Sequence, residues 1–103
     1  MEENVQEEQA LHKEQEDKLT LGGGIELVGF KEIDFGSMVI LKKMVGGYVR
    51  KFSDENQGFE KLIVKLVDKK KIHVELMISG KSKVMEAEAN NLFVSLDKAL
   101  KGL

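Results

Sequence analysis

Lysine and arginine are the residues of this 103-residue chain whose type and spacing point to a chemistry, the binding of phosphate groups. A lysine ammonium is a flexible point charge that displaces the counterions condensed on a polyanion. The residues occur as a Lys-Lys-Lys run at 69–71, as two adjacent pairs, and as single lysines in the predicted strands. The predicted RNA-binding residues are Lys42, Lys43, Arg50, Lys51, Lys61, Lys65, Lys69, Lys70, Lys71, His73, Lys81 and Lys83.

Each of these residues also has an ordinary structural explanation. Lysines are common in turns and on solvated faces, and a lysine on an edge strand prevents aggregation. His73 alternates outward with Glu75. It is therefore either an exposed strand histidine or a residue that stacks on a base or hydrogen-bonds an RNA edge.

The composition argues against an enzyme. The chain has no cysteine, and its two histidines, His12 and His73, cannot form a histidine-rich metal site. No serine lies in a Gly-x-Ser-x-Gly motif, and Asp97 has no histidine near it in sequence. We therefore expect a binding module without catalytic residues, cofactor or metal.

Charge divides the chain into a tail and a body. Residues 1–20 contain seven acidic residues and two lysines, whereas the remainder is weakly basic. The Glu- and Gln-rich start has too few apolar side chains to form a core, which predicts an acidic, disordered tail over residues 1–24. Gly22-Gly23-Gly24 is interpreted as a flexible joint, followed by a single domain over residues 25–103. The tail is either a solubilising leader or a segment that competes with RNA for the basic body.

Hydrophobic periodicity predicts the elements that position the basic residues. Residues 25–30 are typical of a short strand, and apolar residues at spacings of four, three and four predict a helix over 37–52 with Asp34 or Ser37 as its N-cap. Gly46-Gly47 within that helix suggests close packing or a bend. Alternation then predicts strands over 61–67, 72–79 and 83–89, and a last helix starts after Asn90 or Asn91.

This order predicts an α+β, two-layer sandwich. Both amphipathic helices should cover one face of a four-stranded, mostly antiparallel sheet, and the other face should remain open. We expect the open face to carry Lys61, Lys65, His73, Glu75 and Met77, together with Lys81 or Lys83. The longest apolar run has four residues, Met38 to Leu41, so we expect a cytoplasmic protein without a membrane span.

The order of elements and the stretch from Glu86 to Leu100 resemble the ribosome hibernation-promoting factor and ribosome-associated inhibitor family. In that family an Ala- and Glu-rich last strand precedes an acidic or amide cap, an apolar residue, an aromatic residue and an Ile/Leu-Asp-x-Ala stretch. The matching residues here are Asn91, Leu92, Phe93, Leu96, Asp97 and Ala99. Most of these are packing positions, so the resemblance supports the fold more strongly than the function.

The resemblance implies binding in the decoding region of the small ribosomal subunit, as a short form without a dimerising extension. The partner would be ribosomal RNA, and the effect would be inhibition of translation by occupancy. Two alternatives stay open. One is a protein–protein interaction module that uses an exposed sheet face or edge, including a weak homodimer through that edge. The other is an RNA-binding domain unrelated to the ribosome.

Overall fold

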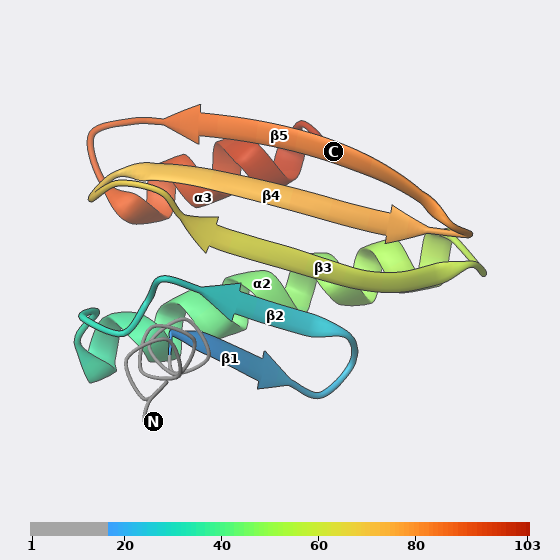
Figure 1. Ribbon diagram of the computed structural model, residues 1–103, viewed down its shortest axis with the longest axis horizontal. Helices are drawn as coiled ribbons and strands as arrows, with labels where there is room; N and C mark the ends of the chain where they lie inside the picture. The colour runs from blue at the N-terminus through green and yellow to red at the C-terminus, as the bar shows by residue number, and fades with distance from the viewer. Residues whose placement is uncertain (1–16) are drawn as a thin grey trace, which may run out of the picture.

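The computed structural model describes residues 17–103, which form a sheet and a pair of helices (Figure 1). The strands are β1 (Lys18–Leu21), β2 (Ile25–Val28), β3 (Phe59–Leu66), β4 (Lys71–Ile78) and β5 (Lys81–Glu88). The helices are α2 (Phe35–Glu55) and α3 (Leu92–Lys101). The α+β class and the predicted order of elements from residue 25 onward are confirmed.

The sheet has five strands rather than the predicted four, in the spatial order β1-β2-β3-β4-β5. β2 and β3 run parallel, with Leu27 opposite Val64, and the other three pairs are antiparallel. Parallel neighbours need a long crossover connection, and α2 lies in that connection. The sheet is therefore mixed, with a single parallel pair between β2 and β3.

The additional strand, β1, lies where the tail and its glycine joint were predicted. Residues 22–24 form the turn of a β1–β2 hairpin, and Gly23 and Gly24 have φ angles of 80° and 84°. A Cβ atom on Gly24 would lie 2.7 Å from the Glu60 carbonyl oxygen, so a side chain does not fit there. The folded domain thus starts before residue 25. The predicted disorder of residues 1–16 lies outside the described residues.

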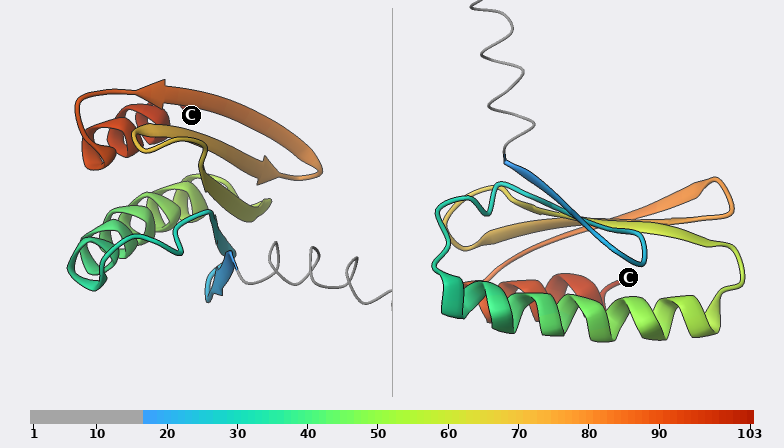
Figure 2. Two further views of the ribbon diagram at one scale, coloured as in Figure 1. Left: turned by 60° about the vertical axis from the view of Figure 1, so that its left-hand side comes forward. Right: turned by 90° about the horizontal axis from the view of Figure 1, so that it is seen from below.

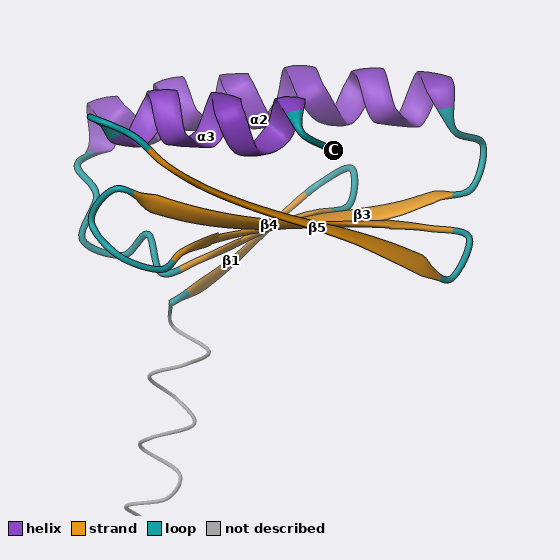
Figure 3. Ribbon diagram, turned by 90° about the horizontal axis from the view of Figure 1, so that it is seen from above, coloured by secondary structure: helices purple, strands orange, loops and turns teal. Residues whose placement is uncertain are grey.

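Both helices pack on one face of the sheet, and within residues 17–103 no element covers the opposite face (Figures 2 and 3). The alternation in β4 explains this arrangement, because Ile72, Val74 and Leu76 are buried while the residues between them face away from the helices. The layer between sheet and helices is the hydrophobic core. Its other buried residues are Ile25, Leu27, Phe30, Leu41, Val45, Val49, Phe52, Leu62, Val64, Leu96, Ala99 and Leu100.

Both helices begin at side-chain caps that the sequence indicates. The Asp34 carboxylate accepts a hydrogen bond from the Ser37 backbone N–H at 3.0 Å, and Asn91 accepts one from the Val94 N–H. Each helix then turns an apolar stripe toward the sheet, as the spacing predicts. These stripes fix which side chains remain on the outer surface of α2 and α3.

Candidate nucleic-acid interface

The cations predicted to bind phosphate lie on two opposite sides of the molecule. Lys61, Lys65 and His73 occupy strand positions that alternate with buried residues, so they lie on the open face of the sheet. Lys42, Lys43, Arg50 and Lys51 lie on α2, in the layer that covers the other face (Figure 3). The predicted residues therefore do not form one continuous surface.

The open face of the sheet carries balanced charge. Its strand positions in residues 17–103 contain four lysines and four glutamates, namely Lys18, Lys61, Lys65, Lys71, Glu26, Glu75, Glu86 and Glu88. Most of the lysines are paired. Glu26 contacts Lys61 at 3.2 Å and Lys18 at 3.4 Å, and Glu86 contacts His73 at 3.0 Å. Such a face has little net attraction for a polyanion.

The lowered pKa of Glu26 indicates that these ion pairs interact electrostatically. Partial burial raises the pKa of the Glu26 carboxyl, but the hydrogen bond and charge of Lys61, with the charge of Lys18, outweigh that effect and hold the pKa below its usual value. The ionised carboxylate therefore remains opposite both ammonium groups. The two lysines are less available to an RNA phosphate as a result.

The lysine run is divided between a turn and a strand. Lys69 and Lys70 are exposed in the turn between β3 and β4, and Lys71 is the first residue of β4. Lys71 lies 3.7 Å from Glu86. The two turn lysines have no ion pair within the described part of the chain. They extend from one end of the sheet rather than from either face.

Lys81 and Lys83 lie on the helix side of the sheet, not on the open face where one of them was expected. They pair across from Ile78 and Leu76, and directly opposite residues of an antiparallel pair share a face. The Lys83 amine donates a hydrogen bond of 3.2 Å to the Leu103 carbonyl oxygen. The open-face expectation was wrong because strand residues alternate with a period of two, which places Lys81 and Lys83 on the same side as Met85 and Ala87.

The helix side has an excess of positive charge. Its helices contain six basic and three acidic residues, namely Lys42, Lys43, Arg50, Lys51, Lys98, Lys101, Asp54, Glu55 and Asp97. The four cations of α2 are all exposed, and none forms an ion pair within residues 17–103. Lys98 and Lys101 were missed in the sequence analysis. The signal that could identify them is their place on the outer side of the predicted last helix.

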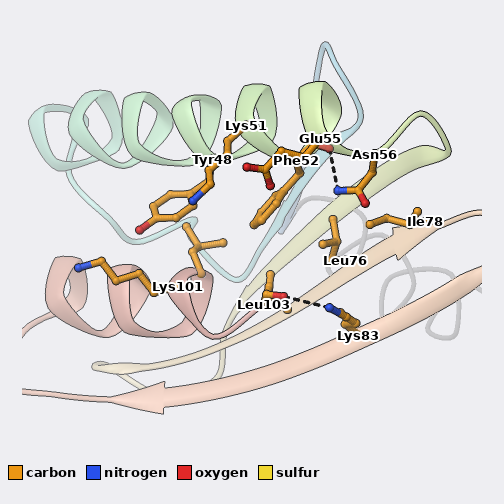
Figure 4. Close-up of a pocket in the computed structure, with 11 residues that line it drawn as sticks. Tyr48, Lys51, Phe52, Glu55, Asn56, Leu76, Ile78, Lys83, Lys101 and Leu103 are labelled. Atoms are coloured by element: carbon orange, nitrogen blue, oxygen red, sulfur yellow. Dashed lines mark hydrogen bonds between the residues drawn. The ribbon is translucent and has the colours of Figure 1, made fainter.

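A cleft of about 380 Å³ separates the ends of α2 and α3 above β4 and β5 (Figure 4). Lys51 of α2, Lys83 of β5 and Lys101 of α3 are among its lining residues, but the Lys101 amine points away from the cleft toward Asp97. Its floor is apolar and includes Leu76 and Leu100. The lining therefore combines lysines from three different elements with one acidic side chain, Glu55.

A hydrogen bond ties the two helices together beside this cleft. The Tyr48 hydroxyl of α2 donates to a carboxylate oxygen of Asp97 on α3 at 2.8 Å, and Lys101 contacts the other oxygen at 3.0 Å. Burial and the Asp97 charge raise the pKa of Tyr48 to about 12. The Tyr48 hydroxyl and Lys101 lower the pKa of Asp97. The Tyr48–Asp97 hydrogen bond therefore has a structural role, because it links α2 to α3.

Asp97 should make the stability of the domain sensitive to acid. Because its folded pKa is lowered, its contribution is fully present above the usual value of 3.8 and is lost as pH falls through the folded value. We expect Asp97→Asn to lose less unfolding free energy than the unmodified protein between about pH 7 and about pH 3, measured by urea titration. Tyr48→Phe should also lose less unfolding free energy than the unmodified protein over this pH range, because it removes the hydrogen bond that lowers the Asp97 pKa. Equal acid losses in all three proteins would contradict this assignment.

An exposed aromatic side chain also lies on α2. Phe35 is the first residue of the helix and is 84% exposed, and Val39 and Ile40 on the following turn are also exposed. The apolar spacing in the sequence predicts a helix start at residue 37, two residues after Phe35. An exposed aromatic ring can stack on an unpaired base.

No protein-family model, curated protein or solved structure matches this chain. Over residues 17–103, no helix is long and apolar enough to cross a membrane. The same part of the chain contains no cluster of three histidine, aspartate or glutamate side chains placed to hold a metal ion. The geometry described above is therefore the basis for the functional assignment.

Proposed function

We propose that this chain binds the small ribosomal subunit through ribosomal RNA and inhibits translation by occupying its site, without chemistry. The observation that carries the proposal is the set of exposed cations on α2 that lack an acidic partner among the described residues. The resemblance of residues 86–100 to ribosome hibernation factors points to the same partner. The contact surface in this proposal is the helix side, not the open face of the sheet.

Charge and shape both favour the helix side for contact with RNA. The α2 lysines, which have no ion pair in the described part of the chain, gain the full benefit of counterion release, whereas Lys18, Lys61 and Lys71 must first exchange their glutamate partners. The helices also bound a cleft that Lys51 lines from α2. A groove lined by cations can contact successive phosphates of a sugar–phosphate backbone, whereas a flat, neutral face attracts them little.

The proposal predicts strongly salt-dependent co-sedimentation with purified small ribosomal subunits. For about four phosphate contacts, the association constant should fall roughly fiftyfold between about 50 mM and about 200 mM salt. The full chain is mixed with subunits, pelleted through sucrose and quantified in the pellet. Purified large subunits, which present RNA of similar charge density, are the control.

Two results would contradict the proposal. Absence of the protein from small-subunit pellets at low salt would exclude this partner. Equal binding to both subunits would show nonspecific attraction to RNA instead of recognition.

A protein–protein module is the second candidate. It is favoured by apolar side chains on the open face, where Ile63 lies between Glu26 and Glu75, and by the free edge of β5, where Val84 is half exposed. Binding of this kind would change little with salt and would depend on Ile63 rather than on the α2 cations. The sedimentation experiment separates the two candidates, because only RNA binding requires the steep salt dependence.

A further inference from the structure

Two adjacent glycines, Gly46 and Gly47, occur in the middle of α2. Glycine is among the least favourable residues inside a helix, so Gly46-Gly47 should have a compensating role. Close packing was one expectation from the sequence. The structure contradicts it, because a Cβ atom on either residue would meet nothing within 4 Å. Neither residue has a positive φ angle, and α2 continues through both as one helix (Figure 3).

Gly47 forms the floor of a shallow hollow on the outer surface. The hollow has a volume of about 370 Å³ and is lined by Lys43, Met44, Gly47, Tyr48 and Lys51. Lys43 and Lys51 lie four residues before and four residues after Gly47, which places all three on one face of the helix. Two cations without an acidic partner in residues 17–103 therefore flank a patch of bare helix backbone.

From this arrangement we infer that the hollow over Gly47 seats one phosphate of an RNA backbone. The missing side chain lets the sugar–phosphate chain approach α2 closely, and the two lysine amines reach the phosphate from opposite sides. The Tyr48 ring lines one side of the hollow. Its hydroxyl is already bound to Asp97, so it is not counted as a phosphate contact. This inference rests on the proposed function and assigns a contact point within it.

The occupant is a polymer phosphate rather than a small free anion. The hollow is open, and two solvated lysines hold a single small anion only weakly. A polyanion that enters the hollow can also reach Arg50, which is exposed on α2 one turn after Gly47. Several weak contacts on one chain add to a stable complex.

The test fills the hollow with a side chain that also suits a helix. Gly47→Leu should weaken binding of the full chain to small ribosomal subunits about tenfold and lower the slope of log affinity against log salt by about one, because one or two phosphate contacts are lost. Gly46→Leu is the matched control, since it makes the same change one position away and outside the hollow. Its affinity should stay within about twofold. Both variants should unfold at a higher temperature than the unmodified protein, because both remove a helix glycine.

Three other results would each contradict a specific part of the proposal. If Gly47→Leu binds as the unmodified protein does, the hollow is not a phosphate seat, although the proposed function stands. If both variants weaken binding equally, RNA covers the whole outer side of α2 and the assignment to Gly47 is wrong. If the unmodified protein does not bind small subunits, the proposed function fails, and this inference fails with it.

Discussion

The double variant Lys43→Glu with Lys51→Glu is expected to bind small ribosomal subunits roughly a hundred- to a thousandfold more weakly than the unmodified protein. Each substitution to glutamate removes one attraction and adds one repulsion to the same phosphates. Both side chains are exposed, so the fold should tolerate the change. Sedimentation of the double variant at low salt measures the loss.

The matched control reverses Lys65 and Lys70, which are equally exposed but lie on the sheet face and in the β3–β4 turn. The net charge of the two double variants is identical, so a difference between them reports position rather than total charge. We expect the control to lose affinity much less. Equal losses would show that RNA is attracted by the overall charge of the domain and not by the helix side.

Leu62→Ala should strongly destabilise the domain. Leu62 is completely buried in β3, and the register places it between Ile25 of β2 and Leu76 of β4. Removal of a buried leucine side chain costs about 2–5 kcal/mol in unfolding free energy, since the cavity closes only partly. Domains of this size are stable by about 5–15 kcal/mol, so the variant should be close to unfolding.

Urea denaturation followed by circular dichroism measures this change, and the dependence on urea concentration should stay constant. Val67→Ala is the control, because Val67 is 54% exposed just beyond β3 and its truncation should cost under about 0.5 kcal/mol. Comparable losses in the two variants would mean that β3 is not central to the core.

The local pattern of the sequence predicts most of the secondary structure. Alternation over 72–79 corresponds to β4, and the three–four spacing of apolar residues corresponds to α2 and α3. Asp34 and Asn91 are cap residues because a side-chain oxygen just before a helix can accept from its free backbone N–H groups. These features depend on residues within one or two turns of one another, so the sequence reveals them.

Pairing between distant segments accounts for what the sequence analysis missed. β1 was missed because Lys18–Leu21 is short and follows an acidic segment, and its stability depends on β2. Likewise, pairing of Glu26 with Lys18 and Lys61 depends on three adjacent strands.

The amino-acid sequence by itself therefore determined a small α+β domain, its helix caps, its apolar stripes and a supply of basic side chains. Only the tertiary structure decided which of those cations remain available. The physical reason is that charge neutralisation requires an acid and a base within a few ångströms, a condition set by strand register and layer packing. On the sheet face that condition is met for Lys18, Lys61 and Lys71, whereas along α2 the lysines and Arg50 remain unpaired within the described chain.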